Sequence, residues 1–194
     1  MLLTISPEEV LEYWLDKLGP EDWYRGGDDL DTEIRTHFEG AWDMAMEGRH
    51  GLWLTYPSGT LAYIILMDQL PRNMFRDTEK AFASDPYALA AAKMAIEKGW
   101  DMKIDEPARQ FFYLPLMHAE NLSDQDRAVR LFATRMPEHG KGNLDHAKAH
   151  REIIRRYGRF PTRNEALGRR LTGPEREFLD LGGYGPIIRA IQAA

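Results

Sequence analysis

Side chains that could bind an anion are concentrated near the carboxyl end of the sequence. Residues 141–170 contain nine Lys/Arg against three Asp/Glu, a local charge of +6, whereas the whole chain carries −6. The polar residues around a glycine turn in this region are Arg156, Arg159, Arg163 and Asn164. Guanidinium groups favour carboxylates and phosphates in bidentate geometry. The charge separation therefore indicates either an anion-binding surface or ion pairs with the acidic amino-terminal half.

Two histidines in the same region are four residues apart. On the helix expected from Asn143 to Tyr157, His146 and His150 share the inward face with Ile153. This spacing can hold a divalent metal, but the Glu of an H-E-x-x-H motif is missing and the spacing assigns no third ligand. We therefore predict no metal site. Two alternatives remain: histidines that form hydrogen bonds at the edge of the core, and histidines that bind a ligand.

A further histidine, His118, is followed two residues later by Glu120 at the end of an apolar segment. A carboxylate at this distance can orient or charge the imidazole, and such a pair can act as a general base. Alternatively, a protonated His118 complements the dipole at a helix C-terminus. The candidate acid–base residues are therefore His118, His150 and Glu120, and the sequence leaves open whether the protein is an enzyme.

Several common chemistries have no support in this sequence. The chain has no cysteine, which excludes disulfides, thiolate metal sites and thiol nucleophiles. It has no G-x-S-x-G, P-loop or G-x-G-x-x-G motif, so serine acyl transfer, nucleoside triphosphate binding and dinucleotide binding lose their usual signatures. We predict no cofactor.

An acidic residue in an apolar segment needs a partner. Asp68 follows a long apolar run, where burial of its charge requires a cation or several hydrogen-bond donors. Arg72 and Arg109 are the candidate cations. Such a pair is either a structural tie between two central helices or part of the wall of a polar pocket.

Helix start and stop signals predict about eight helices and no strand. The first begins at the capping box Ser6-Pro7-Glu8-Glu9, and the second runs from Asp31 to Gly48. The third, residues 60–70, is apolar on nearly every side and should end at Pro71.

The remaining helices are predicted from further caps and prolines. Asp85 caps a helix that opens at Pro86, and the next helix opens at Glu106-Pro107 and kinks at Pro115. Three more follow: one from a capping box at Ser123 to Met136, one from Asn143 to Gly158, and a short last helix that opens at Thr172.

The organisation along the chain predicts one domain over residues 1–194, since no linker composition divides it. Short helices joined by short turns indicate stacked antiparallel helical hairpins of tetratricopeptide-like type. No secretory signal or membrane-spanning run is visible, so a soluble cytoplasmic protein with no membrane partner is expected.

Three motifs in the same order carry a resemblance to a known family. They are Asp68-Gln69-Leu70-Pro71-Arg72-Asn73, then Arg109 with the segment Phe111 to Glu120, and then His150 with the segment Ile153 to Asn164. On these motifs, and over nearly its whole length, the chain resembles the bacterial family designated domain of unknown function 924. The resemblance implies an all-helical, tetratricopeptide-like fold and brings no established activity.

These observations favour a small-molecule site over two alternatives. The predicted site binds a small anionic ligand, and its lining is Asp68, Arg72, Asn73, Arg109, Tyr113, His118, Glu120, His150, Arg156, Arg159, Arg163 and Asn164. The first alternative is a helical-repeat module that binds an acidic protein or peptide through Arg151 and Arg155. Nucleic acid is disfavoured because the rest of the chain carries −12 and would repel a phosphate backbone.

Overall fold

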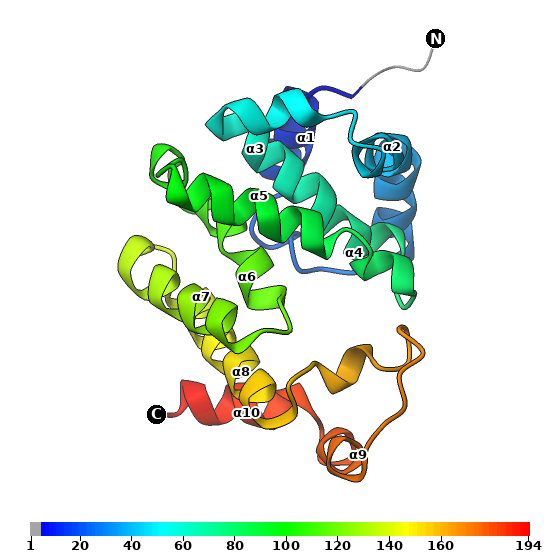
Figure 1. Ribbon diagram of the computed structural model, residues 1–194, viewed down its shortest axis with the longest axis vertical. Coiled ribbons are helices and arrows are strands. Elements are labelled where there is room, and N and C mark those ends of the chain that lie inside the picture. Colours follow the sequence, from blue (N-terminus) through cyan, green and yellow to red (C-terminus); the bar gives the residue numbers. More distant parts are fainter. Residues whose placement is uncertain (1–4) are drawn as a thin grey trace. The chain divides into compact units, whose positions relative to one another are not determined.

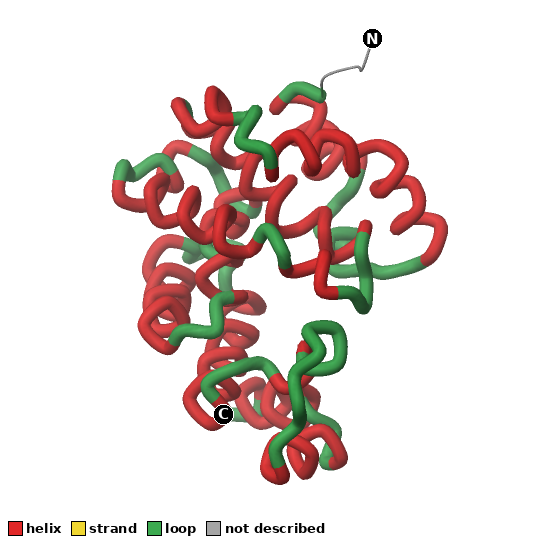
Figure 2. Tube along the Cα trace, turned by 45° about the vertical axis from the view of Figure 1, so that its right-hand side comes forward, coloured by secondary structure: helices red, strands yellow, loops and turns green. Residues whose placement is uncertain are grey.

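The computed structural model describes residues 5–194, and every regular element within that range is helical (Figures 1 and 2). The α-helices are α1 (Pro7–Leu11), α2 (Asp28–Met46), α3 (Pro57–Ile64), α4 (Leu70–Met74), α5 (Asp85–Glu97), α6 (Leu114–His118), α7 (Leu122–Arg135), α8 (Lys141–Tyr157), α9 (Gly173–Asp180) and α10 (Tyr184–Gln192). Short 3-10 helices occupy Gly51–Thr55, Glu79–Phe82, Asp101–Lys103, Ala108–Phe112 and Pro161–Arg163, and π-helical turns occupy Glu12–Lys17 and Ile65–Gln69. The all-α prediction is confirmed, while the tetratricopeptide-like stacking stays a prediction.

Contacts divide the chain into two compact units, Met1–Pro115 and Leu116–Ala194, which are described separately. The prediction of a single domain stays a prediction. Within residues 5–194, no helix is both long and apolar enough to cross a membrane.

The core of the first unit is a continuous run of helix from Pro57 to Met74, in which α3, the π turn and α4 follow one another without a break. The expected stop at Pro71 is wrong. At the end of the π turn the N–H of Leu70 donates to the carbonyl of Ile65, five residues back. Helix α4 therefore starts anew at Leu70, and Pro71 falls in its first turn, where no backbone N–H is needed.

Helices α1, α2 and α5 pack around this run: α1 and α5 contact α3, and α2 contacts α4 (Figure 1). The predicted cap of α5 needs a correction, because Ser84 rather than Asp85 is the N-cap residue. The Ser84 hydroxyl donates to the Met67 carbonyl at 2.6 Å and accepts from Trp42 Nε1 at 2.9 Å. It thus ties α2 and the π turn to the start of α5, and the Asp85 carboxylate remains available for Arg72.

The segment after Pro107 is two short helices rather than one kinked helix. Residues Ala108–Phe112 form a 3-10 helix, and α6 starts afresh at Leu114, so that Pro115 is its second residue. A proline in a first turn costs no hydrogen bond, which removes the reason for a kink. Phe111 and Phe112 are fully buried, as the apolar pattern predicts.

In the second unit α7 and α8 pack against each other and are joined by residues 136–140, which makes them an antiparallel hairpin. The cap of α7 is Asn121, whose side-chain oxygen accepts from Asp124 N at 3.2 Å, and not the predicted Ser123. At the other end of the hairpin, α8 terminates at Gly158 with φ +71°, a left-handed conformation that favours glycine.

Beyond the hairpin, α9 starts after Thr172 as predicted, and Thr172 forms a capping box with Glu175. This helix is not the last one. Helix α10 follows after Gly183, which has φ +58°, and it contacts α8. Its apolar residues Tyr184 and Ile187 pack against the buried cluster of Ile153, Ile154, Phe160 and Phe178.

Candidate functional site

In the first unit, Asp68 is fully buried and forms an ion pair with Arg72. The Arg72 guanidinium lies 3.4 Å from Asp68 Oδ1 and 3.1 Å from Asp85 Oδ1. Its Nη1 also donates to the Asp68 backbone carbonyl, and Gln69 donates to the Asp68 side chain. Of the two predicted cations for Asp68, the structure thus brings Arg72 to it. The network connects the π turn and α4 to the first turn of α5.

Asn73, another predicted ligand-binding residue, forms a similar connection to α2. Its Nδ2 donates to Asp31 Oδ1 at 2.7 Å, and Arg76 donates to both oxygens of the same carboxylate. Asp31 is an acid that the sequence analysis did not single out. Both Asn73 and Asp31 act here as ties between α4 and α2.

The predicted residues Arg109 and Tyr113 also have partners inside the first unit. The Tyr113 hydroxyl donates to Asp101 Oδ2 at 2.6 Å, and both side chains are fully buried. Arg109 donates to the Ile104 carbonyl at 2.9 Å and lies 3.6 Å from Glu106 Oε1. Asp101 was missed because a single carboxylate at the start of a short 3-10 helix gives no sequence signal of burial.

The second unit gathers histidines around His150, which projects from the middle of α8. Its ring lies 6.3 Å from the His118 ring, 5.2 Å from Phe160 and 5.3 Å from Tyr184, measured between centroids. We call His118, His146, His150, Phe160, Arg163 and Tyr184 the imidazole cluster. It draws on α6, α8, α10 and the 3-10 helix Pro161–Arg163.

The protonation state of His150 follows from its surroundings. Burial, together with the neighbouring charges of His118 and Arg163, lowers the pKa of His150 to about 3, so the ring is neutral at physiological pH. His150 Nδ1 lies 3.2 Å from the Met117 carbonyl oxygen. Because a carbonyl can only accept, Nδ1 carries the ring hydrogen and Nε2 keeps its lone pair. The arrangement suits a hydrogen-bond acceptor or a base.

Arg163 supplies positive charge to the same place. Its Nη2 donates to the His118 carbonyl at 3.1 Å, and its guanidinium carbon lies 4.7 Å from the centre of the Phe160 ring. Phe160 therefore has the His150 ring edge-on and the Arg163 guanidinium stacked on it. His118, His150 and Arg163 all keep part of their surface exposed.

Helix α10 contributes Tyr184, which contacts both predicted histidines of α8. Its ring is parallel to that of His146 at 5.9 Å, and its hydroxyl is hydrogen-bonded to His146 Nδ1. Burial raises the pKa of Tyr184 to about 12, so this hydroxyl keeps its proton. His146 is exposed, which corrects the prediction that both histidines face inward. Tyr184 was not predicted as a site residue, although the spacing of Tyr184, Ile187, Ile188 and Ile191 is helical.

Glu120 does not form the predicted pair with His118. It accepts from Arg169 Nη1 at 2.6 Å, from Arg169 Nη2 at 3.0 Å and from Phe160 N at 2.8 Å. Burial opposes ionisation of Glu120, but these hydrogen bonds outweigh it and lower its pKa. The carboxylate thus fixes the backbone of Phe160, and its effect on the imidazole cluster is positional.

Two arginines of the predicted anion site are held by carboxylates of the same unit. Arg159 forms a bidentate pair with the buried Glu175, at 2.5 and 2.8 Å, and this hydrogen bonding lowers the pKa of Glu175. Arg156 donates to Glu152 Oε1 at 2.6 Å. Carboxylates of the second unit itself therefore pair with at least these two arginines of the basic segment.

Asn164, the last predicted residue, is buried and accepts from Arg169 Nε at 2.8 Å. It belongs to the support of the turn after α8. Within the described part of the chain, no group of three or more His, Asp or Glu side chains is placed to hold a metal ion.

The comparisons with known proteins agree with this fold. The model of a family described as a bacterial protein of unknown function, DUF924, matches residues 10–183. The chain belongs to this family. Among solved structures, the protein of unknown function ATU0120 from Agrobacterium tumefaciens is similar, with 37% sequence identity and a TM-score of 0.84. The match covers 91% of this chain and 97% of that one. Curated proteins give no match.

The DUF924 match contains five of the six members of the imidazole cluster. It ends at Gly183, one residue before Tyr184. The family description assigns no activity. Any function must therefore be inferred from the chemistry of the residues themselves.

Proposed function

We propose that this DUF924 protein binds a small anion at the imidazole cluster of its second unit, with Arg163 as the cation and His150 as the polar contact. The observation that carries the proposal is the placement of Arg163 and His150 on the same ring, Phe160, with part of each side chain exposed. A guanidinium stacked on an aromatic ring has a restricted orientation, so less side-chain entropy is lost when it binds an anion.

The surrounding ion pairs support this choice by narrowing the candidates. Arg156 and Arg159 donate to carboxylates, and Arg169 donates to both oxygens of Glu120. An anion at any of these would compete with a carboxylate of the protein. At Arg163, Nη2 donates to the His118 backbone carbonyl, and the guanidinium carbon lies over the Phe160 ring. The predicted ligand-binding residues of the first unit support its helix packing instead.

The proposal does not require catalysis. A neutral imidazole with its Nδ1 hydrogen held by a carbonyl can also serve as a general base once a substrate is bound. His150 is thus the acid–base candidate that the geometry favours over Glu120. Enzyme activity stays open.

The experiment is a thermal-shift screen of phosphorylated metabolites, carboxylates and nucleotides, because a ligand that binds the native state raises its apparent stability. We expect a dose-dependent rise in Tm with at least one anion. The Arg163→Gln variant should bind that anion at least about tenfold more weakly than the wild type, because a lost hydrogen bond to a charged group costs about 1.5–3 kcal/mol.

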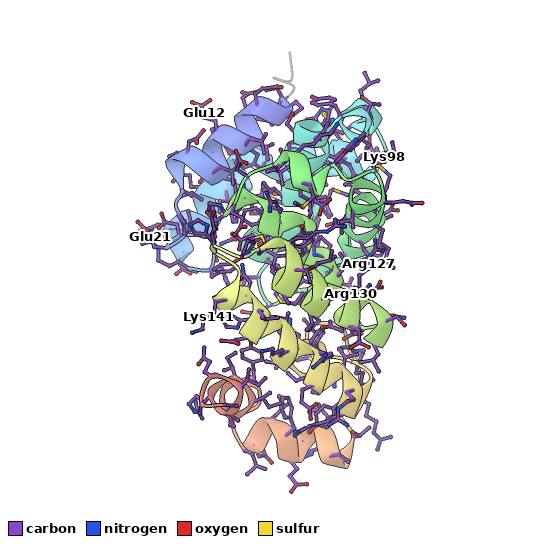
Figure 3. The ribbon with its side chains drawn as sticks, turned by 90° about the vertical axis from the view of Figure 1, so that its left-hand side faces the viewer. Glu12, Glu21, Lys98, Arg127, Arg130 and Lys141 are labelled. Carbon is purple, nitrogen blue, oxygen red and sulfur yellow. The ribbon has the colours of Figure 1, made fainter. Side chains whose placement is uncertain are left out.

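Arg130→Gln is the matched control. Arg130 is an exposed arginine of the same unit, on α7 (Figure 3), and its side chain forms no hydrogen bond or ion pair with any other residue of the range 5–194. The Arg130→Gln variant should bind the anion with the affinity of the wild type. A ligand whose affinity is the same in Arg163→Gln and in the wild type would contradict the proposed site.

The alternative, a helical-repeat module for an acidic partner, receives less support. The two arginines expected to meet that partner are occupied at the surface, Arg151 with Asp126 at 3.4 Å and Arg155 with Glu152 at 2.8 Å. A partner would have to displace both pairs.

A further inference from the structure

The lone pair on His150 Nε2 restricts which anions the site can accept. The Met117 carbonyl fixes the ring hydrogen on Nδ1, so the neutral ring presents only an acceptor at Nε2. Among residues 5–194 the hydrogen bond to Met117 is the only one formed by the His150 side chain. The aromatic neighbours do not satisfy Nε2 either, since the Tyr184 hydroxyl is hydrogen-bonded to His146.

An anion held beside Arg163 would meet this acceptor as well. The two side chains contact the same ring, at 4.7 Å for the guanidinium carbon and 5.2 Å for the imidazole centroid. An oxyanion with no hydrogen would have to place an oxygen lone pair against the lone pair of Nε2, and both would be left unsatisfied. An oxyanion with a hydroxyl next to its charge would satisfy both groups together. Sites built on such a contact reject the analogue that lacks the hydroxyl.

We propose that the ligand of the imidazole cluster is an oxyanion that carries its own hydrogen-bond donor beside the charge, as hydrogen phosphate and 2-hydroxycarboxylates do and as sulfate and simple carboxylates do not. The inference rests on the proposed function, because it assumes that the anion binds at Arg163. It adds the selection rule: Arg163 attracts both kinds of anion, and His150 distinguishes them.

Two pairs of small probes of similar size test the rule: inorganic phosphate against sulfate, and glycolate against acetate. Binding is followed at pH 7 and constant ionic strength by the imidazole C–H signals in NMR spectra of the intact protein, which has six histidines. These signals report on weak binding and identify the residue involved. The probe with the hydroxyl should bind at least about tenfold more tightly within each pair, because the other leaves the acceptor unpaired.

His150→Gln sharpens the test, because a glutamine amide can turn its N–H toward the ligand. We expect sulfate to bind this variant about as tightly as phosphate does. His37→Gln is the matched control, an exposed histidine of the first unit that should keep the preference of the wild type. The comparison of probes on the wild type needs no variant, so it decides the question even if His150→Gln folds poorly.

The outcomes separate the two proposals. If phosphate and sulfate bind equally and both lose affinity in Arg163→Gln, the selection rule is wrong and the anion site is supported. Uptake of a proton by His150 when sulfate binds would lead to the same conclusion. If none of the four probes perturbs the signals of His118, His146 or His150, the anion site itself is wrong.

Discussion

Burial lowers the pKa of a histidine in each unit, His50 in the first and His150 in the second, and the two differ in their exposure and in their charged neighbours. In the first unit, burial lowers the pKa of His50, whose ring is stacked on Trp53 at 4.2 Å and only 4% exposed. In the second unit, burial also lowers the pKa of His150, but this ring remains partly exposed and next to Arg163. Neutral imidazole alone therefore does not identify a site. Access and a neighbouring cation distinguish the histidine that can meet a ligand.

The charges of the two units show the same contrast. The first unit has 11 Lys/Arg and 21 Asp/Glu, a net −10, and the second has 14 and 10, a net +4. In the first unit, buried or half-buried carboxylates such as Asp68 and Asp31 connect helices. In the second, a few acids such as Glu120 and Glu175 occupy most of the arginines around the turn after α8. The number of cations available to a ligand is therefore smaller than the local net charge indicates, because the protein's own carboxylates bind many of them.

The largest expected effect is the loss of the buried ion pair in the first unit. Arg72→Met removes the cation that lies 3.4 Å from the buried Asp68 carboxylate, and we expect the free energy of unfolding to fall by about 3 kcal/mol. Urea denaturation measures the change. Arg76→Met, which removes an arginine that is 46% exposed, should cost less than about 1 kcal/mol. Equal losses in the two variants would remove the distinction between buried and surface pairs.

The second prediction compares stability across pH. Folded His150 stays neutral down to about pH 3, whereas the unfolded chain binds a proton there below about pH 6.5. The unfolded state therefore gains protons first, and stability falls as the pH falls through this window. Between pH 6 and pH 4 the wild type should lose roughly 1 kcal/mol per pH unit more than His150→Gln. His50 titrates alike in both proteins, so parallel stability curves would show that His150 is not held neutral.

A smaller effect is expected from the half-exposed pair of the second unit. Glu120→Gln keeps an acceptor for Phe160 N but removes the charge that faces Arg169, and should cost about 1–2 kcal/mol. Chemical unfolding at pH 7 tests this. Because hydrogen bonding lowers the pKa of Glu120, the difference should disappear as acidification protonates the wild-type carboxylate. Glu165→Gln, at an exposed position, is the control; a cost equal to that of Glu120→Gln would contradict the pairing.

The smallest effect concerns the contact between α10 and α8. Tyr184→Phe removes the hydroxyl bound to His146 but keeps the aromatic packing on His150, so less than about 1 kcal/mol should be lost. NMR should show a change in the His146 ring signals larger than that in the His150 signals. A larger change in the His150 signals would mean that the Tyr184 hydroxyl interacts with His150 and not with His146.

Much of the fold follows from local signals in the sequence. The capping boxes at Ser6 and Thr172 and the left-handed glycine at 158 mark helix ends where the structure has them. The errors arise where tertiary structure changes the local rule. Pro71 does not end a helix because a π turn resets the hydrogen bonding. Ser84 rather than Asp85 is the N-cap residue of α5, and its hydroxyl is hydrogen-bonded to Trp42 and Met67 instead of to the helix backbone.

The candidate site was predictable in its residue types and not in its pairings. The sequence identified His118, His150 and Arg163, which the structure brings together. It paired Glu120 with His118, its neighbour in sequence, whereas the structure pairs it with Arg169, 49 residues away. Such long-range choices depend on how the turn after α8 folds back, and one sequence carries no signal for them. Asp101 and Tyr113 show the same limit inside the first unit.

The π turn at Ile65–Gln69 makes the central helix intolerant of changes in length. Deletion of one residue there would restore ordinary α-helical spacing and rotate everything beyond it by about 100°, moving Asp68 and Arg72 relative to α5. The same deletion would place Pro71 inside a continuous helix, where its ring clashes with the preceding turn. The extra residue and the proline are therefore epistatic. Replacing Pro71 alone should change stability little, but a chain with the shortened turn should fold only if Pro71 is also replaced.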